Sequence, residues 1–165
     1  MIDPITTIAA VGAVKKTDEA LGVIGKLLGK LRFSNEELEQ ILALIENHMR
    51  FKDVGRMKPA TLKRFVRLPQ FEEHLDLHRL YCLSSDRNLA AYDFVKEFVS
   101  TTPPEVVRPP RLLTGSDVLE MGFSAGPVVG KILAAVEEAQ LNGELATEQE
   151  AKSFINKHFG AKAAS

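Results

Sequence analysis

Apolar residues recur at helical spacing along nearly the whole chain. After Ser34 they fall three or four residues apart, at Leu38, Ile41, Leu42, Ile45 and Met49. This interval places them on one face of an α-helix, since 3.6 residues complete a turn. Ser34 and Glu37 form a capping box that predicts the start of this helix. His48 lies off the apolar face, and we interpret it as a polar-face or structural histidine.

Similar signals predict further helices. Pro59 and Pro69 each begin a helical segment, Asn88 caps another, and Thr147 with Glu150 forms a second capping box. Between them, residues 101–113 contain four prolines, and we expect an extended connector there because proline disfavours helix in the residue before it. The pattern as a whole predicts an all-α fold, a compact domain of about seven or eight helices.

The N-terminal part has a feature of its own. The predicted helix of residues 18–31 carries Gly22, Gly25 and Gly29 at small-residue spacing. Mid-helix glycines cost about 1 kcal/mol each, so we expect close approach to another helix, either within the fold or in a homodimer. We place this segment, residues 1–30, apart from a helical domain of residues 31–165. The sequence does not indicate what residues 1–17 do.

Residues 112–130 contain two helix starts in series. Thr114, Gly115 and Ser116 form a turn with a hydroxyl placed to cap a helix over residues 117–121, which Gly122 ends. Gly126 and Pro127 then open a longer helix, which ends at Asn142 and Gly143. Two positive helix ends are therefore expected to lie close together. The local pattern favours a compact corner over the alternative, a phosphate-contact site.

Composition limits the class of protein. The chain has 165 residues, 45% of them hydrophobic and 26% charged, which is typical of one globular domain with a core. Its single cysteine, Cys82, excludes an internal disulfide and suggests a reducing compartment, so we expect a cytoplasmic protein. The apolar start, residues 5–14, is far shorter than the ~20 residues that span a bilayer, and no membrane association is expected.

The charge is unevenly distributed although its sum is only −1. Residues 50–67 carry seven basic side chains and one acidic one. In the helix begun by Pro59, Lys63, Arg64 and Arg67 are expected on the solvent side, with Arg56 and Lys58 just before. No acid lies between Arg56 and Arg67, so their repulsion is uncompensated unless an anion binds. We favour a phosphate-binding surface here over a merely solvated face.

Candidate catalytic and metal sites are weak. His74 and His78 are four residues apart, but Leu75 stands where the HExxH zinc motif needs glutamate, so a structural or RNA-facing pair is favoured over a metal site. The run GPVVGK from Gly126 departs from a phosphate loop in its spacing and in lacking Ser or Thr after Lys131. We predict no cofactor, no metal and no catalytic residue in this chain.

Four stretches of the chain carry recognisable motifs: LLTGSDVLEMGFSAGPVVGKIL, QLNGELATEQEA, FEEHLDLHRLYCLSS and LRFSNEELEQILALIENHMRF. They resemble the bacterial tRNA nucleotidyltransferases, the CCA-adding and poly(A) polymerase family. The first two resemble the C-terminal body and tail, with Ala125 where the family usually has proline, and the third resembles another body segment, with Tyr81 replacing the usual acid. The fourth resembles the end of the HD-type domain. The family's catalytic head needs paired aspartates on a strand, and no Asp-x-Asp occurs here.

The resemblance implies tRNA binding through backbone shape and charge, which positions the 3′ end for CCA addition by a head domain absent from this chain. Three readings are open: a separated fragment, a split product that works with a head domain in trans, or a relic reused as an RNA-binding module. The alternative is a helical protein-interaction or dimerisation domain derived from the family without RNA activity. Whether the chain itself contributes to an enzyme is left open. We predict RNA contacts at Arg56, Lys58, Lys63, Arg64, Arg67, His78, Arg79, Arg108, Arg111, Ser116, Gly126 and Lys131.

Overall fold

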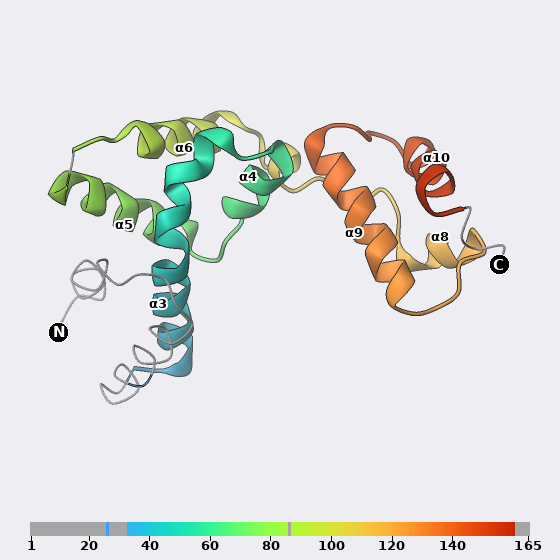
Figure 1. The fold of residues 1–165 in the computed structure, drawn as a ribbon, viewed down its shortest axis with the longest axis horizontal. Helices are drawn as coiled ribbons and strands as arrows, with labels where there is room; N and C mark the ends of the chain where they lie inside the picture. Colours follow the sequence, from blue (N-terminus) through green and yellow to red (C-terminus); the bar gives the residue numbers. More distant parts are fainter. Residues whose placement is uncertain (1–25, 27–32, 86, 161–165) are drawn as a thin grey trace. The chain divides into compact units, whose positions relative to one another are not determined.

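The computed structural model of the chain describes residues 26, 33–85 and 87–160, and every regular element among them is helical (Figure 1). This part of the chain holds eight α-helices and one 3₁₀ helix, which confirms the all-α prediction. The predicted glycine-bearing helix of residues 18–31 and the segment 1–17 fall outside the described residues, apart from Lys26. No helix within the described ranges is long and apolar enough to cross a membrane.

The helices are divided between two compact units, where length and composition predicted one domain. The first unit holds the described residues of Met1–Arg56 and Arg67–Thr101, and the second holds those of Met57–Val66 and Thr102–Ser165. The short helix α4 (Pro59–Phe65) therefore belongs to the second unit, although the segments on both sides of it belong to the first. The predicted basic segment crosses this division twice.

The first unit contains four helices, and each of them packs against at least two of the others (Figure 1). They are α3 (Asn35–Asn47), the 3₁₀ helix η1 (His48–Arg56), α5 (Phe71–Ser84) and α6 (Ala90–Thr101). Its apolar core includes Ile41 and Ile45, which the spacing in α3 predicts, and also Leu44 and Leu77, which it does not. Met49 is an exception and is 38% exposed, because α3 ends at Asn47 and the tighter turn of η1 rotates the next residues away.

The capping signals are correct in this unit, whereas one start is displaced. The Ser34 hydroxyl accepts from the Glu37 amide, and the Glu37 carboxylate accepts from the Ser34 amide across 2.7 Å. The Asn88 side chain accepts from the amide of Ala90 at the start of α6. By contrast, α5 begins at Phe71 and not at Pro69, because Gln70 adopts a left-handed conformation with φ of 49° between them.

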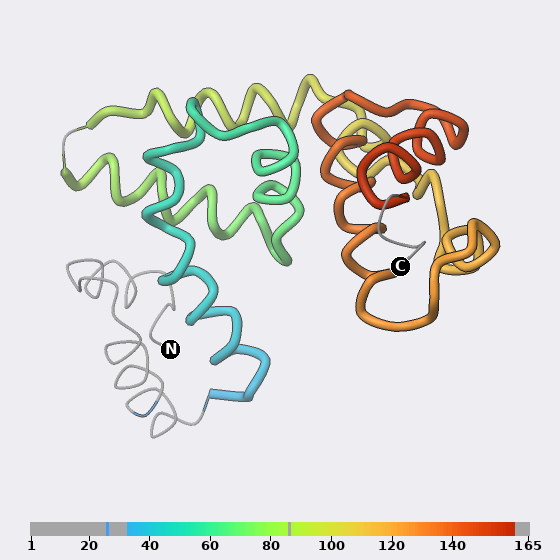
Figure 2. The backbone as a smooth tube through the Cα atoms, turned by 45° about the vertical axis from the view of Figure 1, so that its right-hand side comes forward, coloured from blue at the N-terminus to red at the C-terminus, as the bar shows by residue number. Residues whose placement is uncertain are grey.

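The second unit contains five helices, and the backbone path through them can be followed by colour in Figure 2. They are α4, α7 (Pro104–Val107), α8 (Gly115–Glu120), α9 (Pro127–Asn142) and α10 (Glu148–Phe159). Helices α4, α8 and α10 all pack on α9, which is the central element. The core between them is built from Leu113, Val118, Ile132, Val136 and Ile155, all nearly or fully buried.

Two expectations for this unit are corrected. Residues 104–107 of the predicted extended connector form the short helix α7, because Pro104 occupies the first helical position, where its missing amide costs nothing. The residue before it, Pro103, is extended as expected, with ψ of 144°. Helix α8 begins at Gly115, two residues earlier than predicted, since Thr114 is the capping residue.

Candidate nucleic-acid interface

The predicted basic surface does not fall on one unit. Arg56 and Arg67 belong to the first unit, whereas Lys58, Lys63 and Arg64 belong to the second. The described residues of the first unit carry eight basic and ten acidic side chains, and those of the second carry eight of each. Neither unit is strongly basic, so a nucleic-acid interface would require a local gathering of cations within one unit.

In the second unit, α4 is held on the C-terminal end of α9 by hydrogen bonds. The Lys63 Nζ donates to the carbonyl of Leu141 across 2.8 Å, and the amide of buried Ala60 donates to the Asn142 Oδ1 across 3.1 Å. The last carbonyls of a helix have no intrahelical partner and carry partial negative charge, so they attract a cation. Lys63 is therefore half-buried against α9 and not on the open solvent side.

Arg64 has acidic partners on the same helix. Its Nη1 forms a charge-assisted hydrogen bond with the Glu138 carboxylate, and its Nη2 lies 3.9 Å from Glu137. The expectation of uncompensated repulsion is therefore wrong at Arg64, because acids more than 70 residues away in the sequence compensate it. Sequence spacing offers no signal for Glu138, Leu141 or Asn142 as partners of α4.

The proline connector brings further cations to the same end of α9. Gln140 Nε2 donates to the carbonyl of Pro110 across 2.8 Å, which fixes the connector beside the last turns of α9. The next residue, Arg111, is exposed, as are Arg108 at the end of α7 and Lys58 before α4. Lys63, Arg64 and the segment bearing Arg111 thus meet around the C-terminal half of α9. Of the predicted cations in this cluster, Arg111 and Lys58 are more exposed than Lys63 and Arg64.

At the other end of α9, two helix starts lie together as predicted. A Cβ atom added to Gly115, the first residue of α8, would lie 3.8 Å from Cγ1 of Val129 near the start of α9. Gly126 precedes α9 with φ of 145°, a conformation that only glycine adopts without strain, and it offers no side-chain cap. Ser116 is exposed in the first turn of α8, and Lys131 is exposed at the beginning of the second turn of α9.

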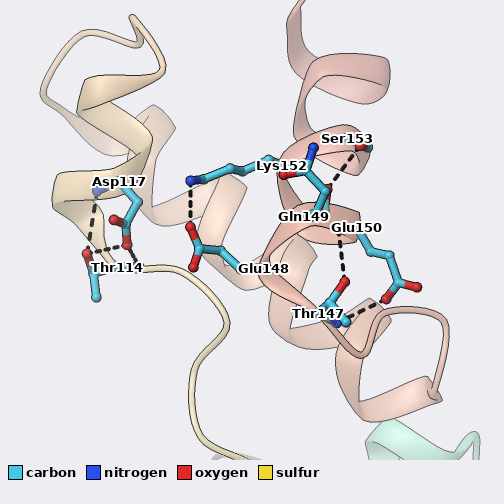
Figure 3. A network of polar contacts seen from close by, with 8 residues as sticks. All are labelled: Thr114, Asp117, Thr147, Glu148, Gln149, Glu150, Lys152 and Ser153. Atoms are coloured by element: carbon cyan, nitrogen blue, oxygen red, sulfur yellow. Dashed lines mark hydrogen bonds and ion pairs between the residues drawn. The ribbon is translucent and has the colours of Figure 1, made fainter.

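The α8 start is already occupied by a carboxylate of the chain. Asp117 Oδ2 accepts from the Thr114 amide at 2.6 Å and from its hydroxyl at 2.7 Å, and these bonds lower the pKa of Asp117 (Figure 3). The positive charge of Lys152, from α10, favours the same ionised form. A phosphate would meet this negative charge at α8. The two starts are therefore unequal, and α9 is the one without a side-chain cap.

In the first unit, the predicted residues are scattered. Arg56 is exposed at the end of η1, Arg79 is exposed on α5, and Arg67 is half-buried. His78 is only 5% exposed, and its ring stacks on Phe51 with centroids 4.4 Å apart. Its Nε2 lies 3.5 Å from the sulfur of Cys82. These contacts give His78 a packing role, which was one of the two alternatives for the histidine pair.

His74 is the most deeply buried histidine of the described residues, at 1% exposure. Neither of its ring nitrogens has a hydrogen-bond partner, and Phe71 lies beside the ring. Burial, and then the charge of Arg50, lowers the pKa of His74, so the ring is neutral at pH 7. In the described ranges, no three His, Cys, Asp or Glu side chains are grouped as metal ligands.

Sequence reasoning missed a cavity in the first unit. It measures about 530 Å³ and lies between η1, α5 and α6, with lining side chains that include Lys52, Tyr81 and Phe94. No sequence motif marks the cavity, because its lining residues come from η1, α5 and the α6 region and are too far apart in the sequence to form one pattern. The exposure of Phe94, 42% although it is a large apolar residue, is visible only in the structure.

Comparison with known proteins yields relatives in one functional group. The chain is 31% identical over 132 residues to a CC-adding tRNA nucleotidyltransferase of Thermus thermophilus, which covers 76% of the chain and 29% of that protein. It is 36% identical over 78 residues to an A-adding tRNA nucleotidyltransferase of Deinococcus radiodurans, 47% of the chain and 16% of the relative. A CC-adding enzyme of Synechocystis is 20% identical over 132 residues.

The chain thus spans less than a third of the length of each of these relatives. No family model matches the sequence, and no solved structure matches it significantly. The likeness is to a portion of these proteins, in agreement with the resemblance of the body and tail segments.

Proposed function

We propose that this chain, which is related to a portion of the tRNA nucleotidyltransferases, binds tRNA and positions its acceptor end for CCA addition. The observation that carries the proposal is the 31% identity to a CC-adding enzyme over three quarters of the chain. The chemistry is assigned to a head domain, supplied in trans or by a longer form of the protein. These 165 residues contain no Asp-x-Asp pair for the two metal ions of nucleotidyl transfer.

The C-terminal half of α9 is the surface we assign to the RNA backbone. Lys58 and Arg111 are exposed beside it, while Lys63 and Arg64 fix α4 and the cluster around it. Such a division is useful for phosphate binding, because cations held on a rigid helix pair lose little freedom when RNA arrives. The uncapped start of α9, with Gly126 and Lys131, is a second contact of the same kind.

The proposal is tested by gel-shift titration of the purified chain with tRNA, with a poly-adenylate strand and with a random duplex of equal length. Binding that favours tRNA is expected. In parallel, the chain alone should incorporate no labelled CTP or ATP at any magnesium concentration. If no tRNA binds at low salt, the RNA proposal fails, and the alternative of a protein-interaction or dimerisation domain replaces it. Sedimentation of the same sample then shows whether a homodimer forms.

A further inference from the structure

The cavity in the first unit is the feature that tRNA backbone binding leaves unexplained. Its volume of about 530 Å³ is within the range of small-molecule sites. Three elements border it: η1, α5, and α6 with its preceding turn. The cavity therefore lies wholly inside one unit.

Small residues leave the space that larger ones would fill. Gly55 has no heavy atom within 4 Å of an added Cβ, and Ala90 and Ala91 form the wall on α6. Two aromatic rings border the space, Tyr81, which is half-buried, and Phe94, which is 42% exposed. An exposed aromatic ring beside a cavity is suited to stacking on a planar group, because such stacking removes apolar area of both partners from water.

The polar lining has a positive bias. Lys52 is exposed at the cavity, and none of its described lining residues is acidic. Tyr81 and Asn88 add polar side chains to the lining, and the Asn88 Oδ1 also accepts from the Ala90 amide. His78 and Cys82 are buried in the wall and paired with each other. A planar aromatic ligand with a negative charge matches this set: rings for its face, polar groups for its edge and an ammonium for its anion.

We propose that this cavity binds one nucleotide, with its base against Tyr81 and Phe94 and its phosphate at Lys52. Base stacking on aromatic side chains with a nearby cation is the general way in which proteins hold an unpaired nucleotide. The nucleotide is either free or an unpaired residue of an RNA strand. The second case rests on the proposed tRNA binding, whereas the first is independent of it.

Saturation-transfer NMR with the four nucleoside monophosphates, and with adenosine, tests binding to the free chain. We expect base protons to receive saturation, and AMP to bind at least fivefold more tightly than adenosine. Ala91→Trp should weaken AMP binding at least tenfold by filling the space, while Ala134→Trp, the same change at an exposed position of α9, should not. If the wild-type chain transfers no saturation to any monophosphate, the proposal is overturned.

A second variant keeps the test independent of folding. Lys52→Met removes the charge of an exposed residue of η1, so AMP should bind this variant no better than adenosine does. Lys96→Met, at an exposed lysine of α6, is the control and should keep the preference for AMP. An unchanged preference for AMP in Lys52→Met would refute the phosphate assignment. For the source, tRNA affinity is measured with Ala91→Trp: a loss of at least threefold supports a nucleotide of the RNA strand, and an unchanged affinity with AMP binding lost supports a free nucleotide.

Discussion

The Nζ atom of Lys63 donates a hydrogen bond to the carbonyl of Leu141, so a lysine expected to face an RNA phosphate closes the end of α9 instead. The neighbouring Arg64 joins the same helix through Glu138. These bonds explain why α4 packs with the second unit although the chain on both sides of it belongs to the first. They also change the effect that substitutions in the basic segment should have on stability.

Lys63→Met should destabilise the second unit although it keeps the alkyl stem. The variant leaves the Leu141 carbonyl without its charged donor, and we expect the free energy of unfolding to fall by about 0.5–1.5 kcal/mol. Urea unfolding followed by circular dichroism measures this. Lys58→Met is the matched control, since the Lys58 side chain makes no capping bond, and it should change stability by less than about 0.5 kcal/mol. Equal midpoints for the two variants would contradict the role of Lys63.

The exposed cations Lys58 and Arg111 should contribute more to RNA binding than Lys63 and Arg64, whose side chains are bonded to α9. In the double variant Lys58→Gln with Arg111→Gln, the slope of log affinity against log salt should flatten by roughly 1.4–1.8, at 0.7–0.9 per phosphate contact, with little change in melting temperature. In Lys63→Gln with Arg64→Gln, the melting temperature should fall and the slope should flatten less. Titration of tRNA at several salt concentrations checks this. An unaltered slope in the first variant would move the RNA contact to the start of α9.

Acid should weaken the three capping boxes. Hydrogen bonds from Ser34 and Thr114 lower the pKa of Glu37 and Asp117. The pKa of Glu150 is lowered by bonds from the amides of Ala146 and then Thr147. A carboxyl whose pKa is lower in the folded state stabilises fully above its ordinary pKa, about 4. That contribution is lost as the pH falls through the lowered value. Stability should therefore drop below about pH 4, and Glu150→Gln, whose amide does not titrate, should flatten the drop.

The buried His74 predicts a separate pH dependence at higher pH. Its pKa is lowered by burial and by Arg50, so its neutral form is favoured in the folded state. The contribution of His74 to stability is therefore complete above the ordinary histidine pKa of about 6.5 and is lost as the pH falls below that value. His74→Phe fits the aromatic surroundings at Phe71 and removes two unpartnered nitrogens, so it should be neutral or stabilising. Its unfolding midpoint should not change between pH 7 and 5, in contrast to the wild type.

Local signals account for most of what could be predicted about the elements. The capping boxes at Ser34 and Thr147, and the end of α9 at Gly143, are set by residues a few positions apart, and each is found where the pattern places it. The displaced start of α5 and the helix α7 are missed for a local reason as well. Gln70 and Pro104 adopt conformations that their neighbours do not force.

The sequence alone determined the helical class, the capping boxes at Ser34 and Thr147 and the relation to the tRNA nucleotidyltransferases, because periodicity, caps and motifs lie in short stretches of chain. Only the tertiary structure decided which cations are engaged. Lys63 and Arg64 meet partners on α9 more than 70 residues away, and no spacing rule links them. The tertiary structure also creates the cavity between η1, α5 and α6. This space results from how the three helices pack, and none of their separate sequences contains a motif that indicates it.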